Sequence, residues 1–170
     1  MVTMISKYVS LKEVTYSQTA ISNCIDNTPS DKQLILIKDT ATHIFDKLRE
    51  WVGNSVKINS IFRGPKLNKK IGGSNSSQHC VGLNPKLNSY GSAFDVDDTF
   101  GHKTNKEMFM FIKDNLEFDQ LIYEFGTDKN PDWVHFSYRG DGKNRKEVLR
   151  SVYVKNEKTG KMETDYIPYI

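Results

Sequence analysis

Two segments of the chain carry apolar residues at the three- and four-residue spacing of a helix with one buried face. In residues 27–53 these positions are Leu34, Ile37, Ala41, Ile44, Phe45, Leu48 and Val52. Thr28 is the expected N-cap, Pro29 suits the first helical position, and Gly53 is the expected stop. In residues 103–116 the apolar positions are Met108, Phe109, Ile112 and Leu116. The pattern therefore predicts a long helix and, later in the chain, a shorter one.

Apolar and polar residues alternate, as in half-buried strands, at several places in the rest of the chain. The predicted strands are residues 56–62, 92–98, 118–125 and 133–139, followed by a C-terminal hairpin over 146–170 that turns at 157–160. Residues 64–79 are predicted to form a loop with one helical turn, and residues 1–27 an N-terminal arm. Helices first and a run of strands afterwards predict an α+β fold. We expect a mostly antiparallel sheet flanked by helices, in a single domain over 1–170.

Composition narrows the class of protein. The chain has 170 residues, of which 37% are hydrophobic, and a mean hydropathy of −0.58, which suits one well-hydrated domain without a membrane span. The first residues form no apolar signal region, so we expect synthesis in the cytoplasm without a leader. A net charge of +3 with scattered lysines does not indicate nucleic-acid binding, but it suits attraction to an anionic cell wall. Cys24 and Cys80 are expected to be free thiols.

Candidate chemistry lies in two of the four histidines and in one aspartate. His135 alternates with Val134 and Phe136 in a predicted strand, so its side chain is expected on the opposite face from theirs. Asp95 alternates with apolar residues in the same way, and His79 follows a polar loop. A hydrolytic zinc site uses three such ligands, keeps a fourth position open, and needs a nearby carboxylate to move a proton. From the residue types alone, structural histidines and a strand-end aspartate remain the simpler interpretation.

The order of the candidate residues forms a series of three motifs, Ser77-x-His79, Gly91-x-Ala93-x-Asp95 and Trp133-x-His135. Together they resemble the zinc DD-peptidase family. That family includes D-alanyl-D-alanine carboxypeptidases and dipeptidases and phage L-alanyl-D-glutamate endolysins, and it shares its fold with the zinc domain of hedgehog proteins. The resemblance extends over about residues 5–140, and the N-terminal arm is similar to that of the phage-type branch.

The resemblance implies a site and a reaction. It implies that one zinc ion is bound by His79, Asp95 and His135. It makes Glu124 the general base, which takes a proton from the attacking water and passes it to the leaving amine. Arg63 would grip a substrate carboxylate or carbonyl, and Ser77 would support the substrate or the residues around the metal.

Two departures from the family pattern leave alternatives open. In the pattern S-x-H-x-x-G-x-A-x-D the aspartate follows the histidine by seven residues, whereas Asp95 follows His79 by sixteen. We interpret residues 81–90 as an insertion that alters the rim of the cleft, since loop length costs little closure entropy. Many members also place the catalytic glutamate three residues before the last histidine, where this chain has Asp132. We favour Glu124, because aspartate is one methylene shorter and Pro-Asp is typical of a turn.

The function that the resemblance implies is that of a monomeric zinc metallopeptidase, which cleaves peptidoglycan stem peptides at D-Ala-D-Ala or L-Ala-D-Glu bonds. The expected lack of a leader favours a phage or prophage lysis enzyme that reaches the cell wall after release, or a virion component. A second hypothesis is a zinc-stabilised binding or structural module of the same fold without catalysis. A third is a hydrolase that uses Cys80 as nucleophile with His79 or His135.

Overall fold

The structure, a computed structural model, describes residues 2–82 and 91–170. The strands in these ranges are β1 (Lys57–Ser60), β2 (Gly91–Asp97), β3 (Gln120–Glu124), β4 (Trp133–Arg139), β5 (Glu147–Lys155) and β6 (Met162–Pro168). The α-helices are α1 (Leu11–Thr15), α2 (Gln18–Ser22), α3 (Asp31–Thr40), α4 (Asp46–Val52), α5 (Pro65–Lys70) and α6 (Asn105–Asn115). A π-helical segment, η1 (Ala41–Phe45), joins α3 to α4.

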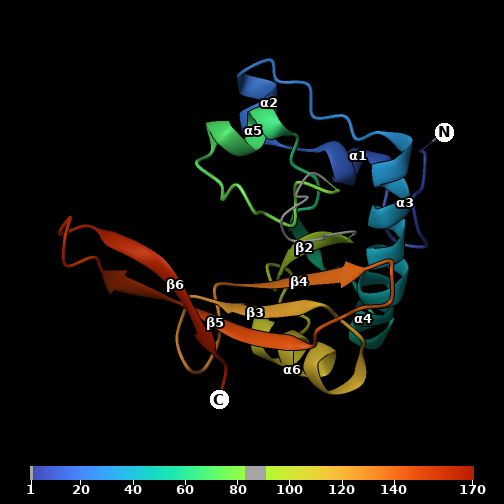
Figure 1. Ribbon diagram of the computed structural model, residues 1–170. Coiled ribbons are helices and arrows are strands. Elements are labelled where there is room, and N and C mark those ends of the chain that lie inside the picture. Colours follow the sequence, from blue (N-terminus) through green and yellow to red (C-terminus); the bar gives the residue numbers. More distant parts are fainter. Residues whose placement is uncertain (1, 83–90) are drawn as a thin grey trace.

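The strands form one sheet in the order β1-β2-β4-β3-β5-β6 (Figure 1). Neighbouring strands pair antiparallel, except for β3 and β5, which pair parallel. The predicted α+β class with a mostly antiparallel sheet is therefore confirmed. Strand β1 is shorter than predicted, because Ile61 and Phe62 leave the sheet and are buried in the core.

The long helix begins two residues later than predicted. Ser30, not Thr28, is the N-cap, and its backbone N–H donates to the side-chain oxygen of Gln33 at 2.9 Å, as in a capping box. The backbone N–H of Thr28 donates instead to the carboxylate of Asp26. Gly53 ends the helix in the left-handed conformation, with φ 71°, as the sequence predicted.

One face of the sheet packs against helices and forms the core. β2 and β4 contact α3, and β3 and β4 contact α6. The strand residues buried on this face are Phe94, Val96, Leu121, Tyr123, Val134 and Phe136. The helix residues buried against them all belong to the two apolar patterns predicted from the sequence: Ile37, Ala41, Ile44, Phe45, Leu48, Met108, Phe109 and Ile112. Because side chains alternate along a strand, the intervening residues project from the opposite face of the sheet.

The N-terminal arm contains α1 and α2 and is tied to the segment between β1 and α5. The side-chain amide of Asn27 donates to the carbonyl of Phe62 at 3.1 Å, and its oxygen accepts from the backbone N–H of Gly64 at 2.8 Å. These two bonds hold the backbone on both sides of Arg63. No helix in the described ranges combines the length and the apolar character needed to cross a membrane.

The predicted C-terminal hairpin is formed by β5 and β6, and it extends beyond the main body of the molecule (red in Figure 1). The backbone of Asn156 donates to Lys161 at 2.8 Å across its turn. Strand β5 continues the sheet beside β3, with Tyr123 opposite Arg150. The hairpin is thereby fixed next to Glu124, the last residue of β3.

Candidate active site

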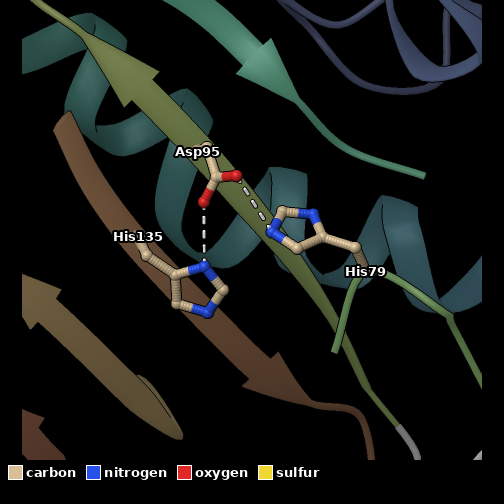
Figure 2. Close-up of side chains that lie close together, drawn as sticks. All are labelled: His79, Asp95 and His135. Carbon is tan, nitrogen blue, oxygen red and sulfur yellow. Dashed lines mark hydrogen bonds and ion pairs between the residues drawn. The ribbon is translucent and has the colours of Figure 1, made fainter. Parts of the chain in front are cut away.

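Asp95 and His135 lie opposite each other on adjacent strands, on the sheet face that the helices do not cover. Their Cα atoms are register partners in the antiparallel pair β2–β4. Oδ1 of Asp95 lies 2.9 Å from Nδ1 of His135 (Figure 2). Both residues are buried, at 7% exposed each. The flanking core residues Phe94 and Phe136 stack on the other face, at 5.6 Å between ring centroids. Sheet register and core packing together fix these two side chains.

His79 reaches the same point from the loop that precedes β2. Its Nδ1 lies 2.8 Å from the carbonyl oxygen of Ile61, and its Nε2 lies 3.1 Å from Oδ2 of Asp95 (Figure 2). A carbonyl only accepts, so Nδ1 carries the proton and the lone pair of the neutral ring is on Nε2. The backbone N–H of Arg63 also donates to the carbonyl of His79 at 3.0 Å, which anchors the loop.

The three predicted ligands form a compact donor set. One ligand atom from each of His79, Asp95 and His135 lies within 4.8 Å of the others, and all three residues are buried. Ligands at about 2.0–2.1 Å from a tetrahedral zinc ion lie about 3.3 Å apart, close to the observed contacts of 2.9 and 3.1 Å. Two imidazoles and one carboxylate are ligand types that suit zinc. The residues therefore fit a zinc ion.

Protonation favours metal binding at this donor set. Burial alone would raise the pKa of Asp95, but interactions with His79 and His135 outweigh burial and hold that pKa well below its usual range. Burial lowers the pKa of His79, against the opposing effect of the Asp95 carboxylate, so a cation displaces a proton from Nε2 more easily. An ionised carboxylate and a neutral imidazole are the forms that bind a cation.

Arg63 lies at the edge of the donor set. Its Nη2 donates to Oδ2 of Asp95 at 3.0 Å, and its Nε donates to the hydroxyl of Ser60 at 3.0 Å. Arg63 lies three residues after the last residue of β1, in the segment that Asn27 holds in place. Ser77 lies in the loop before His79, where its carbonyl accepts from the backbone N–H of Cys80 at 3.0 Å.

Glu124 ends β3 on the same face of the sheet and is 5% exposed. Burial raises the pKa of Glu124, against the opposing effects of His135 and of a hydrogen bond from Ser151. The hydroxyl of Ser151 also accepts from the backbone N–H of Phe125 at 2.8 Å, where Phe125 has the uncommon φ of 50°. A carboxylate with a raised pKa in a hollow is suited to proton transfer.

A hollow of about 710 Å³ lies over this face of the sheet. The six predicted site residues all line it: Arg63, Ser77, His79, Asp95, Glu124 and His135. Asp132, the rival general base, is exposed and is not among the lining residues. The far wall includes Leu149, Thr164 and Tyr166 of the C-terminal hairpin. Of the predicted insertion over 81–90, residues 83–90 lie outside the described residues.

Two residues at the site were not identified from the sequence. The side-chain oxygen of Gln78 lies 3.2 Å from Nε2 of His135, and its amide nitrogen donates to Asp119 at 3.1 Å. Asp119 is buried, at 2% exposed, just before β3. Gln78 occupies the variable position of the Ser77-x-His79 motif, so only its polarity and its place beside a candidate ligand mark it in the sequence.

The cysteines and His43 are not part of the donor set. Cys80 is buried, and burial raises the pKa of its thiol, which disfavours the nucleophilic thiolate of the third hypothesis. Cys24 and Cys80 are both free in the structure. His43 is exposed and stacks on Tyr138 at 4.4 Å between ring centroids, away from the donor set.

Comparison with known families gives an independent assignment. The model of the Peptidase M15 family matches residues 7–137, a range that contains all six predicted site residues and ends before β5. A comparison with curated proteins found no match. The family match covers well over half of the chain and agrees with the resemblance to zinc DD-peptidases. The chain therefore belongs to the peptidase M15 family.

Proposed function

We propose that the protein is a zinc-dependent peptidase that cleaves the stem peptides of peptidoglycan. The observation that carries the proposal is the buried donor set of His79, Asp95 and His135, which opens into the same hollow as Glu124. Membership of the peptidase M15 family supports the reaction class and the peptidoglycan substrate.

The chemistry is divided between the ion and the chain. A zinc ion held by His79, Asp95 and His135 would supply a Lewis acid that lowers the pKa of a water molecule and polarises the scissile carbonyl. Glu124 is the proposed general base, since it lies in the hollow with a raised pKa. In its ionised form it takes the proton of the attacking water, and it then donates that proton to the nitrogen of the leaving amine.

Arg63 and Ser77 are the proposed substrate contacts. The side-chain hydrogen bonds of Arg63 within the described residues use Nε and Nη2, so Nη1 remains for a carboxylate or carbonyl of the substrate. Its bond to Asp95 also restrains the guanidinium beside the donor set. Ser77 lines the hollow from the loop that carries His79, where its hydroxyl can hydrogen-bond the peptide backbone.

Mass spectrometry of digested peptidoglycan tests the proposal and identifies the bond. The zinc-loaded protein is incubated with purified stem peptides and with intact sacculi, and the new termini are determined. Loss of a terminal D-alanine indicates D-Ala-D-Ala cleavage, and a new amino terminus on D-glutamate indicates L-Ala-D-Glu cleavage. A zinc-loaded protein that leaves both substrates intact would instead support a non-catalytic, zinc-stabilised module.

The proposal extends to the biological setting in which the protein acts. We place the protein among phage or prophage lysis enzymes, or among virion components, because its N-terminal arm resembles that of the phage-type branch. Cleavage of an L-Ala-D-Glu bond would support this setting, whereas release of D-alanine alone would favour a carboxypeptidase role.

A further inference from the structure

Asp119 is a buried carboxylate that the proposed reaction does not use. It lies just before β3 and accepts hydrogen bonds from two side chains. Arg145 donates to it from Nε at 2.9 Å, from Nη2 at 2.7 Å and from its backbone N–H at 3.2 Å. Gln78 donates to it from its side-chain amide at 3.1 Å. A buried charge is stable only when paired and hydrogen-bonded, and Arg145 meets that condition with a bidentate contact.

The orientation of the Gln78 amide follows from Asp119. An ionised carboxylate only accepts, so the NH2 group of Gln78 must face Asp119, and its carbonyl oxygen must face the other way. That oxygen lies 3.2 Å from Nε2 of His135. An amide oxygen also only accepts, so Nε2 of His135 is the donor and carries a proton.

The proton on Nε2 determines which nitrogen of His135 can bind a metal. Nδ1 lies 2.9 Å from Asp95 and faces the donor set. It is left either to donate to that carboxylate or, without a proton, to offer its lone pair to a cation. The arrangement parallels His79, where the Ile61 carbonyl holds a proton on Nδ1 and leaves Nε2 for the ion.

We propose that Asp119 and Gln78 are positioning residues that hold the proton of His135 on Nε2 and thereby assign Nδ1 to the zinc ion. Arg145 holds the Asp119 carboxylate in place through its two side-chain hydrogen bonds and one backbone hydrogen bond. The inference rests on the proposed metal site, because it concerns how one of its ligands is oriented. Hydrogen bonds of this kind orient ligating histidines and raise their basicity.

Arg145 links the C-terminal segment of the chain to the proposed metal site. It lies beyond residue 137, outside the part of the chain that the family model matches. It is therefore a contribution of the C-terminal segment to the metal site. Its second partner is Glu147, the first residue of β5, whose Oε2 lies 3.1 Å from Nη1 of Arg145, whereas Asp119 accepts from Nε and Nη2.

The test compares zinc affinity and the state of the His135 ring in two variants and one control. Gln78→Met removes the acceptor while it keeps the length of a partly exposed side chain, so the variant is expected to fold. Asp119→Asn keeps the shape but removes the charge that orients Gln78. Glu147→Gln is the matched control, because it removes a carboxylate partner of Arg145 and leaves Asp119 intact. Thermal unfolding of each metal-free variant checks the fold.

Chelator competition is expected to show zinc affinity about 10- to 100-fold lower for Gln78→Met and Asp119→Asn, and within about twofold for Glu147→Gln. Ring ¹⁵N NMR of histidine-labelled protein should show a proton on Nε2 of His135 and, with zinc bound, coordination through Nδ1. Unchanged affinity in folded Gln78→Met, or coordination through Nε2, would overturn the inference.

A failure of the metal site itself has a different signature. If the unaltered protein binds no zinc, the proposed function fails. The ring spectrum of the metal-free protein then still tests the position of the proton on His135. A proton on Nε2 in the unaltered protein that is lost in Gln78→Met supports the inference. Identical spectra of the two proteins contradict it.

Discussion

Glu124→Gln separates catalysis from structure more sharply than any other substitution at this site. Glu124 is 5% exposed, and the variant side chain has nearly the same size, so the packing around it should persist. A glutamine can still accept the hydrogen bond from Ser151, but it cannot take a proton from water. We therefore expect kcat/KM to fall by about 10²- to 10⁴-fold, the usual contribution of a general base, or about 3 to 5 kcal/mol of barrier.

The same substitution should make the metal-free protein more stable near neutral pH. Burial raises the pKa of Glu124 above its usual 4.5, so the folded state binds this proton more tightly than the unfolded state does. Stability is then lost as pH rises from 4.5 through the raised folded pKa. Glutamine has no proton to lose. The melting temperature of the variant should therefore exceed that of the unaltered protein by an amount that grows across this window and is then constant.

The assay pairs two measurements on the same preparations. Hydrolysis of a purified stem peptide is measured with zinc-loaded protein, and thermal unfolding is followed with metal-free protein across the acid-to-neutral range. Asp132→Asn is the matched control, since Asp132 is exposed, and it should leave both quantities nearly unchanged. If Glu124→Gln retains kcat/KM within tenfold, or if Asp132→Asn loses as much activity, the assignment of the general base is wrong.

Three further predictions concern the surroundings of Glu124 and of the hollow. Ser151→Ala removes the hydrogen-bond donor that lowers the pKa of Glu124, so the acid limb of the pH profile of kcat/KM should move to higher pH. An unchanged pH profile would mean that this hydrogen bond does not act on the general base. Tyr166→Ala removes a ring from the wall of the hollow and should raise KM about three- to tenfold without weakening zinc binding, whereas Ile167→Ala, on the other face of β6, should change neither. Trimming residues 81–90 to the family length should spare zinc binding and change the preferred stem peptide, as measured by competition between substrates; loss of zinc binding would show that the motif was misaligned.

The elements of the fold were largely predictable from the sequence, but their ends and partners were not. Helical periodicity identified the core faces of α3, α4 and α6, because burial of one face imposes a spacing that the sequence records. The N-cap was misplaced because Thr28 and Ser30 are both good caps, and Gln33 decided between them through its bond to Ser30. The parallel pairing of β5 with β3 depends on long-range packing and leaves no local pattern.

The candidate site was predictable where single residues carry the chemistry. His79, Asp95 and His135 are recognised by residue type, alternation and order along the chain. Their contact depends on the β2–β4 register, which no local rule supplies. Gln78 and Asp119 were missed for a different reason. Neither belongs to a ligand pattern, and their role follows only from the three-dimensional contact with His135 and Arg145.

The central claim is that one zinc ion, held by His79, Asp95 and His135, enables hydrolysis of stem peptides. The most direct measurement is a titration of zinc into the metal-free protein, with hydrolysis of a purified stem peptide followed at each addition. The account predicts no hydrolysis without metal, a linear rise to a plateau at one ion per chain, and neither binding nor hydrolysis at that stoichiometry for Asp95→Ala. Hydrolysis that proceeds in the metal-free protein, or that Asp95→Ala retains, would contradict it.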